Sequence, residues 1–365
     1  MSAHIAGSGW VTPLGSGVDE VWDRLNNGDQ AQAEPTTGEA GATSYQACKV
    51  PASAMSALPP HPRLRRASAI SRFAAGAGLA AIKDARNRGL TIDPDRMAIV
   101  FAISNGGVIY TRRFYHDIVQ SGASSASPIL FPETVFNAPA SHLSALLGVS
   151  GQSYTLVGDG SVGLSALNMA EALLNDESLE GCLVVGAEEI DWLLCDAYAR
   201  WRLLRRAPVG NKPAGGMIPS EGAGAILLAR TGSVRIEKSQ AAIHYENRRE
   251  LKSRLKAVLD QIGSQPKDVI VGSSNGTFID RAERAVLRET ASGALFYPPK
   301  WAMGESVGAS GLWQTIAGAK ALEAQKLPPS GDGPAAREAR EFKSKNALII
   351  SCGLNQGVSA LRLAI

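Results

Sequence analysis

The chain is poor in the side chains that build cross-links, metal sites and histidine-based catalysis. Its 365 residues include only four cysteines and five histidines. The cysteines, which form neither a CxxC pair nor a zinc spacing, are Cys48, Cys182, Cys195 and Cys352. We therefore expect reduced, buried thiols in a cytoplasmic protein, with no metal and no cofactor. No histidine lies in a glycine-rich turn late in the chain, which argues against a histidine-based triad.

Long apolar runs and strong net charge are also missing. No apolar stretch reaches the roughly 18 residues that a membrane-spanning helix needs. The formal net charge of +3 is too close to neutral to indicate nucleic-acid binding. Glycine-rich pieces at 104–107 and 304–311 do not follow a strand in the GxGxxG form, which excludes dinucleotide binding by that motif. We expect neither a membrane nor a nucleic acid as partner.

Short apolar runs alternate with helical patterns along the chain, which predicts an α/β layered fold. The predicted strands are residues 98–102, 181–185, 223–229, 269–272, 347–351 and 358–364. The predicted helices are residues 73–86, 164–174, 250–262 and 312–324. Polar, small-residue stretches at 30–44 and 328–337 indicate surface loops. A change of character near residue 235 divides the chain into two halves, 1–235 and 236–365.

One tract combines a β-rich stretch, a tight turn and an amphipathic helix. It covers residues 151–170 and reads GQSYTLVGDGSVGLSALNMA. This layout resembles the nucleophile segment of the thiolase-fold β-ketoacyl synthases. Five further tracts resemble that family in order along the chain, at residues 5–25, 127–151, 215–229, 300–311 and 351–364. The resemblance therefore covers nearly the whole sequence, and it implies a five-layered α-β-α-β-α duplicated fold.

The departures from the family pattern fall on its chemistry. Condensing synthases use a cysteine nucleophile at a helix N-terminus, assisted by two histidines. Ungapped matching places the cysteine position at Gly160, the first histidine at Asn275 and the second at Glu305, while the family's lysine is retained as Lys300. Loss of all three groups implies a chain without condensing activity. Such a chain is similar to the chain-length-factor subunits that pair with an active ketosynthase in polyketide, aryl-polyene or fatty-acid-like biosynthesis.

Two other interpretations stay open. The first is an enzyme of another kind on the same fold, a thioester hydrolase or acyltransferase that uses Asp159, Ser161 or Glu305. Serine at a helix start is more often a cap, and a carboxylate donates to an oxyanion only when its pKa is strongly raised. The second interpretation is a homodimeric protein that holds carrier-linked acyl chains without catalysis.

The resemblance also implies where partners bind. Family dimers join through the strand before the nucleophile turn, which here contains Ser153, Tyr154, Thr155, Leu156 and Val157. Residues implied in the acyl channel are Asn105, Leu130, Phe131, Phe136, Cys352 and Leu354. Acyl carrier proteins are acidic and deliver a phosphate-linked arm, for which arginine is the expected contact. The arginines that fit this role are Arg63, Arg65, Arg66, Arg205 and Arg206.

Overall fold

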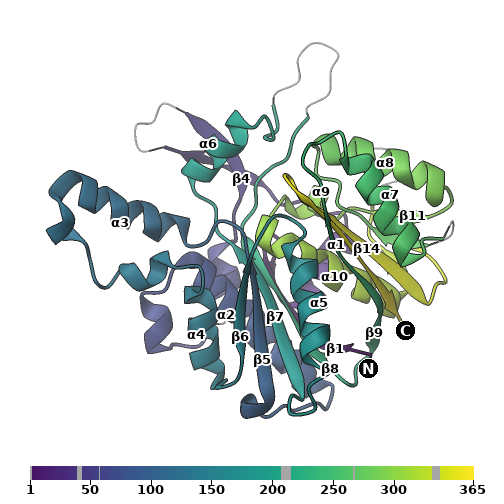
Figure 1. Cartoon of the computed structure of the whole chain (residues 1–365), viewed down its shortest axis with the longest axis horizontal. Coiled ribbons are helices and arrows are strands. Elements are labelled where there is room, and N and C mark those ends of the chain that lie inside the picture. The colour runs from purple at the N-terminus through teal and green to yellow at the C-terminus, as the bar shows by residue number, and fades with distance from the viewer. Residues whose placement is uncertain (1, 39–42, 57, 207–214, 266–267, 331–337) are drawn as a thin grey trace.

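The computed structural model describes residues 2–38, 43–56, 58–206, 215–265, 268–330 and 338–365, and its core is one large mixed sheet (Figure 1). One half of this sheet has the order β6 (Ser153–Val157), β5 (Met97–Ile103), β7 (Gly181–Glu188), β8 (Gly222–Ala229) and β1 (His4–Thr12). The other half has the order β11 (Leu295–Tyr297), β10 (Val269–Val271), β14 (Asn346–Cys352), β15 (Gly357–Ala364) and β9 (Val234–His244).

Both half-sheets repeat one topology. In each, the first three strands of that order are parallel, and the last two each run antiparallel to their neighbours. The halves meet where His4 and Ile5 of β1 pair with Arg235 and Val234 of β9. Shared strand order and direction in successive parts of the chain are the mark of a duplicated fold.

Helices cover and separate the half-sheets. The central layer contains α5 (Val162–Leu173) and α10 (Val307–Ala324). The outer layers contain α2 (Ala69–Asn87) and α4 (Ala138–Leu147) on one side, and α7 (Leu251–Ile262) and α8 (Phe278–Thr290) on the other. A helix that is apolar all round must be buried, and α10 is buried over most of its length. The α-β-α-β-α thiolase-like fold expected from the resemblance is confirmed.

Glycine allows the two central helices to approach closely. A side chain built on Gly163 of α5 would place its Cβ 3.2 Å from the Cα of Gly311 on α10. Because α5 begins directly after the turn that contains Gly160, this close contact with α10 holds the two half-sheets together near that turn.

Every strand and helix predicted from the sequence is present. The strands correspond to β5, β7, β8, β10, β14 and β15, and the helices to α2, α5, α7 and α10. The loop prediction for 30–44 was wrong, because β3 (Ala33–Thr37) pairs there with β4 (Ser44–Cys48). That hairpin depends on cross-strand pairing, which local composition does not reveal. Residues 39–42 and 331–337 of the two predicted loops lie outside the described residues.

Further elements complete the fold. They are β2 (Gly15–Ser16), α1 (Val18–Asn26), η1 (Ala52–Met55), η2 (Pro62–Arg65), η3 (Pro94–Arg96), α3 (Val108–Ser121), η4 (Ala123–Ser125), η5 (Phe131–Thr134), α6 (Trp192–Arg200), α9 (Lys300–Met303), β12 (Lys326–Leu327) and β13 (Arg340–Glu341). Figure 1 shows α3 extending away from the layers, and none of its residues is buried. Within the described chain, no helix combines the length and apolar character that crossing a bilayer requires.

Candidate functional site

Gly160 lies in the turn between β6 and α5, against the turn that joins β14 to β15. A Cβ built on Gly160 would lie 3.1 Å from the carbonyl oxygen of Cys352 and 3.2 Å from the Cα of Gly353. The hydroxyl of Ser351 donates to the carbonyl oxygen of Gly160 over 2.7 Å. The C-terminal turn therefore occupies space that a side chain at position 160 would enter.

The other three sequence-predicted positions come together beside this turn. Lys300 Nζ lies 2.9 Å from Glu305 Oε2, and both side chains are only 1% exposed. Asn275 Nδ2 donates to the same carboxylate oxygen over 2.7 Å. Asn275 Oδ1 in turn accepts from the backbone N–H and the hydroxyl of Thr277. The side chains of Asn275 and Glu305, which the resemblance matches to histidines, thus form one hydrogen-bonded group with Lys300.

Ser273 links this group to the C-terminal turn, and sequence reasoning missed it. Lys300 Nζ donates to Ser273 Oγ over 3.2 Å, and the backbone N–H of Cys352 donates to the same oxygen over 2.9 Å. Behind it, Glu283 accepts from the Ser273 N–H over 2.7 Å. Burial raises the pKa of Glu283 to about 7. The signal available in the sequence was only that Ser273 directly follows the predicted strand at 269–272 and lies two residues before Asn275.

The site contains no evident substitute nucleophile among the thiols. Cys352 is buried, and burial raises the pKa of its thiol well above the ordinary value. A raised thiol pKa lowers the thiolate fraction at neutral pH, and the thiolate is the reactive form. Cys48, Cys182 and Cys195 are likewise free and buried, with thiol pKa values that burial raises.

Neither residue that flanks Gly160 is placed to act as a nucleophile. Asp159 accepts hydrogen bonds from the backbone N–H groups of Leu354, Asn355 and Gln356. Ser161 occupies the N-cap position of α5 without a side-chain capping hydrogen bond, and it is buried. The expectation that Ser161 acts as a cap therefore does not match its geometry. A carboxylate that already accepts several N–H groups is a poor nucleophile, because attack would require breaking those hydrogen bonds.

The residues implied in an acyl channel differ in their contacts and in their exposure to solvent. Asn105 Nδ2 donates to the hydroxyl of the buried Tyr198 over 3.0 Å, a contact that sequence reasoning missed. Phe136 packs on Gly106, whose built Cβ would lie 3.0 Å from the phenylalanine ring. Phe131 is 56% exposed and contacts Phe114 of α3, with ring centroids 5.8 Å apart.

The remaining members of that set differ in element and in burial. Leu130 is partly exposed and directly precedes η5, whereas Cys352 and Leu354 are buried in the C-terminal turn. Glu133 anchors the loop that carries Leu130, because its carboxylate accepts from the Ser68 N–H over 3.0 Å. Within the whole set, Asn105 and Phe136 lie in adjacent segments, because Gly106 next to Asn105 contacts the Phe136 ring.

β6 forms an edge of the sheet. It pairs in parallel with β5, and Ser153, Tyr154 and Val157 are exposed while Thr155 and Leu156 are partly buried. Tyr154 is 39% exposed and Val157 54%. An edge strand with exposed apolar side chains offers unpaired backbone groups and apolar surface to another chain.

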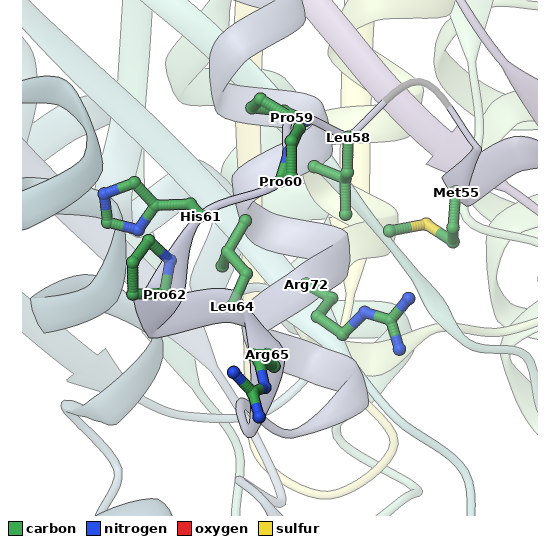
Figure 2. Close-up of a pocket in the computed structure, with 9 residues that line it drawn as sticks. All are labelled: Met55, Leu58, Pro59, Pro60, His61, Pro62, Leu64, Arg65 and Arg72. Carbon is green, nitrogen blue, oxygen red and sulfur yellow. The ribbon is translucent and has the colours of Figure 1, made fainter.

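Three of the arginines named for carrier binding line cavities, Arg65 in one and Arg205 with Arg206 in another. One has a volume of about 520 Å³ and is lined by Met55, Leu58, Pro59, Pro60, His61, Pro62, Leu64, Arg65 and Arg72. Figure 2 shows the guanidinium of Arg72 extending beneath Met55, with Arg65 directed away from the prolines. Arg63 and Arg66 lie exposed on the same segment. Arg205 and Arg206 line the second cavity, of about 260 Å³, beside Tyr45 and Met217.

The duplicated layers and the turn at Gly160 define a thiolase-fold protein of the ketosynthase type. Residues 3–233 match the family model described as the β-ketoacyl synthase N-terminal domain. The chain belongs to the β-ketoacyl synthase family. A comparison with curated protein sequences gave no match.

Several solved structures share the fold over the whole chain. A β-ketoacyl synthase from Burkholderia phymatum STM815 has a TM-score of 0.82 at 18% identity, covering 100% of this chain and 99% of that one. The ishigamide ketosynthase/chain length factor has a TM-score of 0.81 at 19% identity, covering 100% and 98%. The ketosynthase ApeO in complex with its chain length factor ApeC, from Xenorhabdus doucetiae, has a TM-score of 0.79 at 17% identity, covering 100% and 98%.

Proposed function

We propose that this chain is a non-catalytic ketosynthase-like subunit that pairs with an active β-ketoacyl synthase and shapes the channel for the growing acyl chain. The observation that carries the proposal is the buried group of Asn275, Lys300 and Glu305 beside a glycine at the nucleophile position. It would serve an assembly line for polyketides, aryl polyenes or fatty-acid-like chains.

The chemistry of Asn275, Lys300 and Glu305 supports the proposal that this chain does not condense acyl and malonyl thioesters. A condensing site needs a nucleophile to hold the acyl chain and neutral donors for the developing oxyanion. Gly160 has no side chain to acylate. Glu305 holds a carboxylate against Lys300 where a donor is required, so its negative charge would repel an oxyanion.

A role through assembly fits the exposed apolar surface. Tyr154, Val157, Phe131 and Phe136 are exposed around the edge strand β6 and the loop after α3. Stable obligate interfaces bury roughly 2,000 Å² or more and are rich in such side chains. The ishigamide and Xenorhabdus doucetiae structures named above are each described as a ketosynthase with a chain length factor.

The carrier protein is the second proposed partner. Arg65 and Arg72 border one cavity and Arg205 and Arg206 another, and guanidinium groups suit the phosphate and acidic surface of an acyl carrier protein. One structure with the same fold is described as a type II acyl-carrier protein in complex with its ketosynthase. We also propose a cytoplasmic location, in keeping with four free, buried thiols.

Purification with and without a ketosynthase encoded beside it tests the proposal. We expect a stable heterodimer on co-expression, with condensation of acyl and malonyl carrier thioesters only by that complex. Turnover of thioesters by the chain alone would instead support the hydrolase or acyltransferase interpretation. A homodimer that retains an acyl ligand without a ketosynthase would support the acyl-binding interpretation.

A further inference from the structure

The carboxylate of Asp159 lies at the centre of a set of backbone donors. Its Oδ1 accepts from the N–H of Gly160 over 2.5 Å and from the N–H of Leu354 over 2.8 Å. Its Oδ2 accepts from the N–H of Asn355 over 2.7 Å and from that of Gln356 over 2.9 Å. Four backbone N–H groups from two distant turns therefore converge on one side chain.

The two N–H groups that donate to Asp159 Oδ1 are arranged like a pair that binds an oxyanion. One is the N–H of the residue at the nucleophile position, and the other belongs to the turn that packs against it. Two backbone N–H groups that converge on one oxygen beside a nucleophile make the arrangement that stabilises an oxyanion in acyl transfer. In this chain a carboxylate oxygen from within the protein already occupies that position.

Packing shows that the C-terminal turn is held closely over this carboxylate. A Cβ built on Gly353 would lie 2.2 Å from Asp159 Oδ2, and one built on Gly357 would lie 2.3 Å from Ser161 Oγ. The hydroxyl of the buried Tyr245 donates to the Gly353 carbonyl oxygen over 2.8 Å. Glycine at both positions is what permits the approach, because any side chain there would displace the turn.

We propose that Asp159 is a positioning residue that fills the oxyanion position of this subunit and holds the turn at 352–357 closed over Gly160. The inference deepens the proposed function and rests on it. A thioester carbonyl cannot reach the two N–H groups while the carboxylate accepts from them. Charge-assisted hydrogen bonds are strong, so an incoming neutral thioester does not displace Asp159. The active partner alone then takes acyl groups.

Reactivity of an introduced thiol tests this directly. The proteins to compare are Gly160→Cys and the double variant Asp159→Ala/Gly160→Cys, each in complex with the ketosynthase partner. Two probes separate access from oxyanion stabilisation. Iodoacetamide alkylates a thiolate without an oxyanion. A short acyl thioester of N-acetylcysteamine acylates it through one. The thiolate sulfur attacks the carbonyl and forms a new carbon–sulfur bond, the bond from the carbonyl carbon to the N-acetylcysteamine sulfur breaks, and the departing thiolate takes a proton from water.

We expect both reactions at residue 160 to be about tenfold faster or more in the double variant, because several charge-assisted hydrogen bonds no longer hold the turn. Peptide mass mapping assigns the label to residue 160, and Asp159→Ala alone measures labelling at Cys352. Equal rates of either reaction with and without Asp159 overturn the proposal. Because condensation is not the readout, this result is independent of whether the wild-type chain proves active.

Amide hydrogen exchange provides a second test that does not depend on the cysteine variants folding. In Asp159→Ala we expect faster exchange at Leu354, Asn355 and Gln356, and added formate should slow it by restoring a carboxylate to the same donors. If Asp159→Ala only destabilised the turn in general, added formate would not change the exchange rates. The matched control is Asp176→Ala, which removes a surface carboxylate that accepts from the Ser178 N–H over 2.8 Å. Unchanged exchange at the three amides, or no effect of formate, overturns the proposal.

Discussion

Lys300 and Glu305 form an ion pair whose atoms Nζ and Oε2 are 2.9 Å apart and whose side chains are almost completely buried. The pair lies where the resemblance implied a catalytic lysine and histidine. Glu305 Oε1 has no hydrogen-bond partner among the described residues, while Oε2 accepts from both Lys300 and Asn275. A buried charge needs its partner, so we interpret the lysine as retained for its charge.

Removal of one member of this pair should destabilise the chain strongly. Lys300→Met leaves the carboxylate of Glu305 buried without its cation, which typically costs about 3–5 kcal/mol in the free energy of unfolding. Lys300→Met/Glu305→Leu should recover most of that loss. Urea unfolding measures both. The control Lys256→Met breaks a pair with Asp260 in which the side chains are 47% and 55% exposed, and it should cost below about 1 kcal/mol.

The wild-type chain should not condense malonyl and acyl thioesters, and Gly160→Cys alone should not restore condensation. The side chains at positions 275 and 305 still lack the histidine chemistry that decarboxylation requires. Radiolabelled malonyl incorporation by the purified chain, free of other synthases, measures this. Condensation above the level of a mock purification would contradict the proposed non-catalytic role.

Leu130 should help set the length of the partner's products. It is partly exposed on a loop anchored by Glu133, beside the exposed Phe131. Leu130→Trp should shorten the products and Leu130→Ala should lengthen them, because the volume of the side chain limits the channel. Mass spectrometry of products from the assembled complex provides the measurement. Normal assembly with an unchanged product distribution in both variants would show that Leu130 packs only within its own subunit.

Charges introduced on β6 should prevent assembly. Tyr154→Asp/Val157→Asp places two carboxylates on an exposed edge that we propose is buried against the partner. Burial of unpaired charge costs several kcal/mol, so affinity should fall by about a hundredfold or more. Ile365→Asp, which alters a residue of 51% exposure at the chain end, should leave affinity unchanged. Sedimentation velocity of the mixed subunits distinguishes the two results.

Stability should fall as the pH rises from about 5 to 8. Burial raises the pKa of Glu188 to about 8 and that of Glu189 to about 7, from an ordinary 4.5. The folded chain therefore binds protons that the unfolded chain has released in this range, and the free energy of unfolding decreases with pH. Glu188→Gln should make this dependence shallower. Urea midpoints at several pH values measure the slope, and a slope unchanged in the variant would contradict the assignment to Glu188.

The sequence alone determined the layered fold and indicated the positions at which the chain departs from the condensing family's pattern. Strands such as β7 and β8 are nearly continuous apolar runs because they are buried on both faces, and such runs can be recognised from the sequence without a structure. The replacements at Gly160, Asn275 and Glu305 were visible because each lies inside a short tract with a recognisable order. The β3–β4 hairpin was missed because cross-strand pairing, not composition, stabilises it.

Only the tertiary structure decided what the remaining side chains do. Asp159 and Leu354 are 195 positions apart in the sequence, yet they share a hydrogen bond of 2.8 Å. Ser273 connects Lys300 to Cys352 through contacts that no local pattern encodes. Hydrogen bonds between distant segments depend on how the two half-sheets and the central helices pack. The sequence therefore indicated which positions depart from the family pattern, and the packing revealed the carboxylate and the turn that lie beside Gly160.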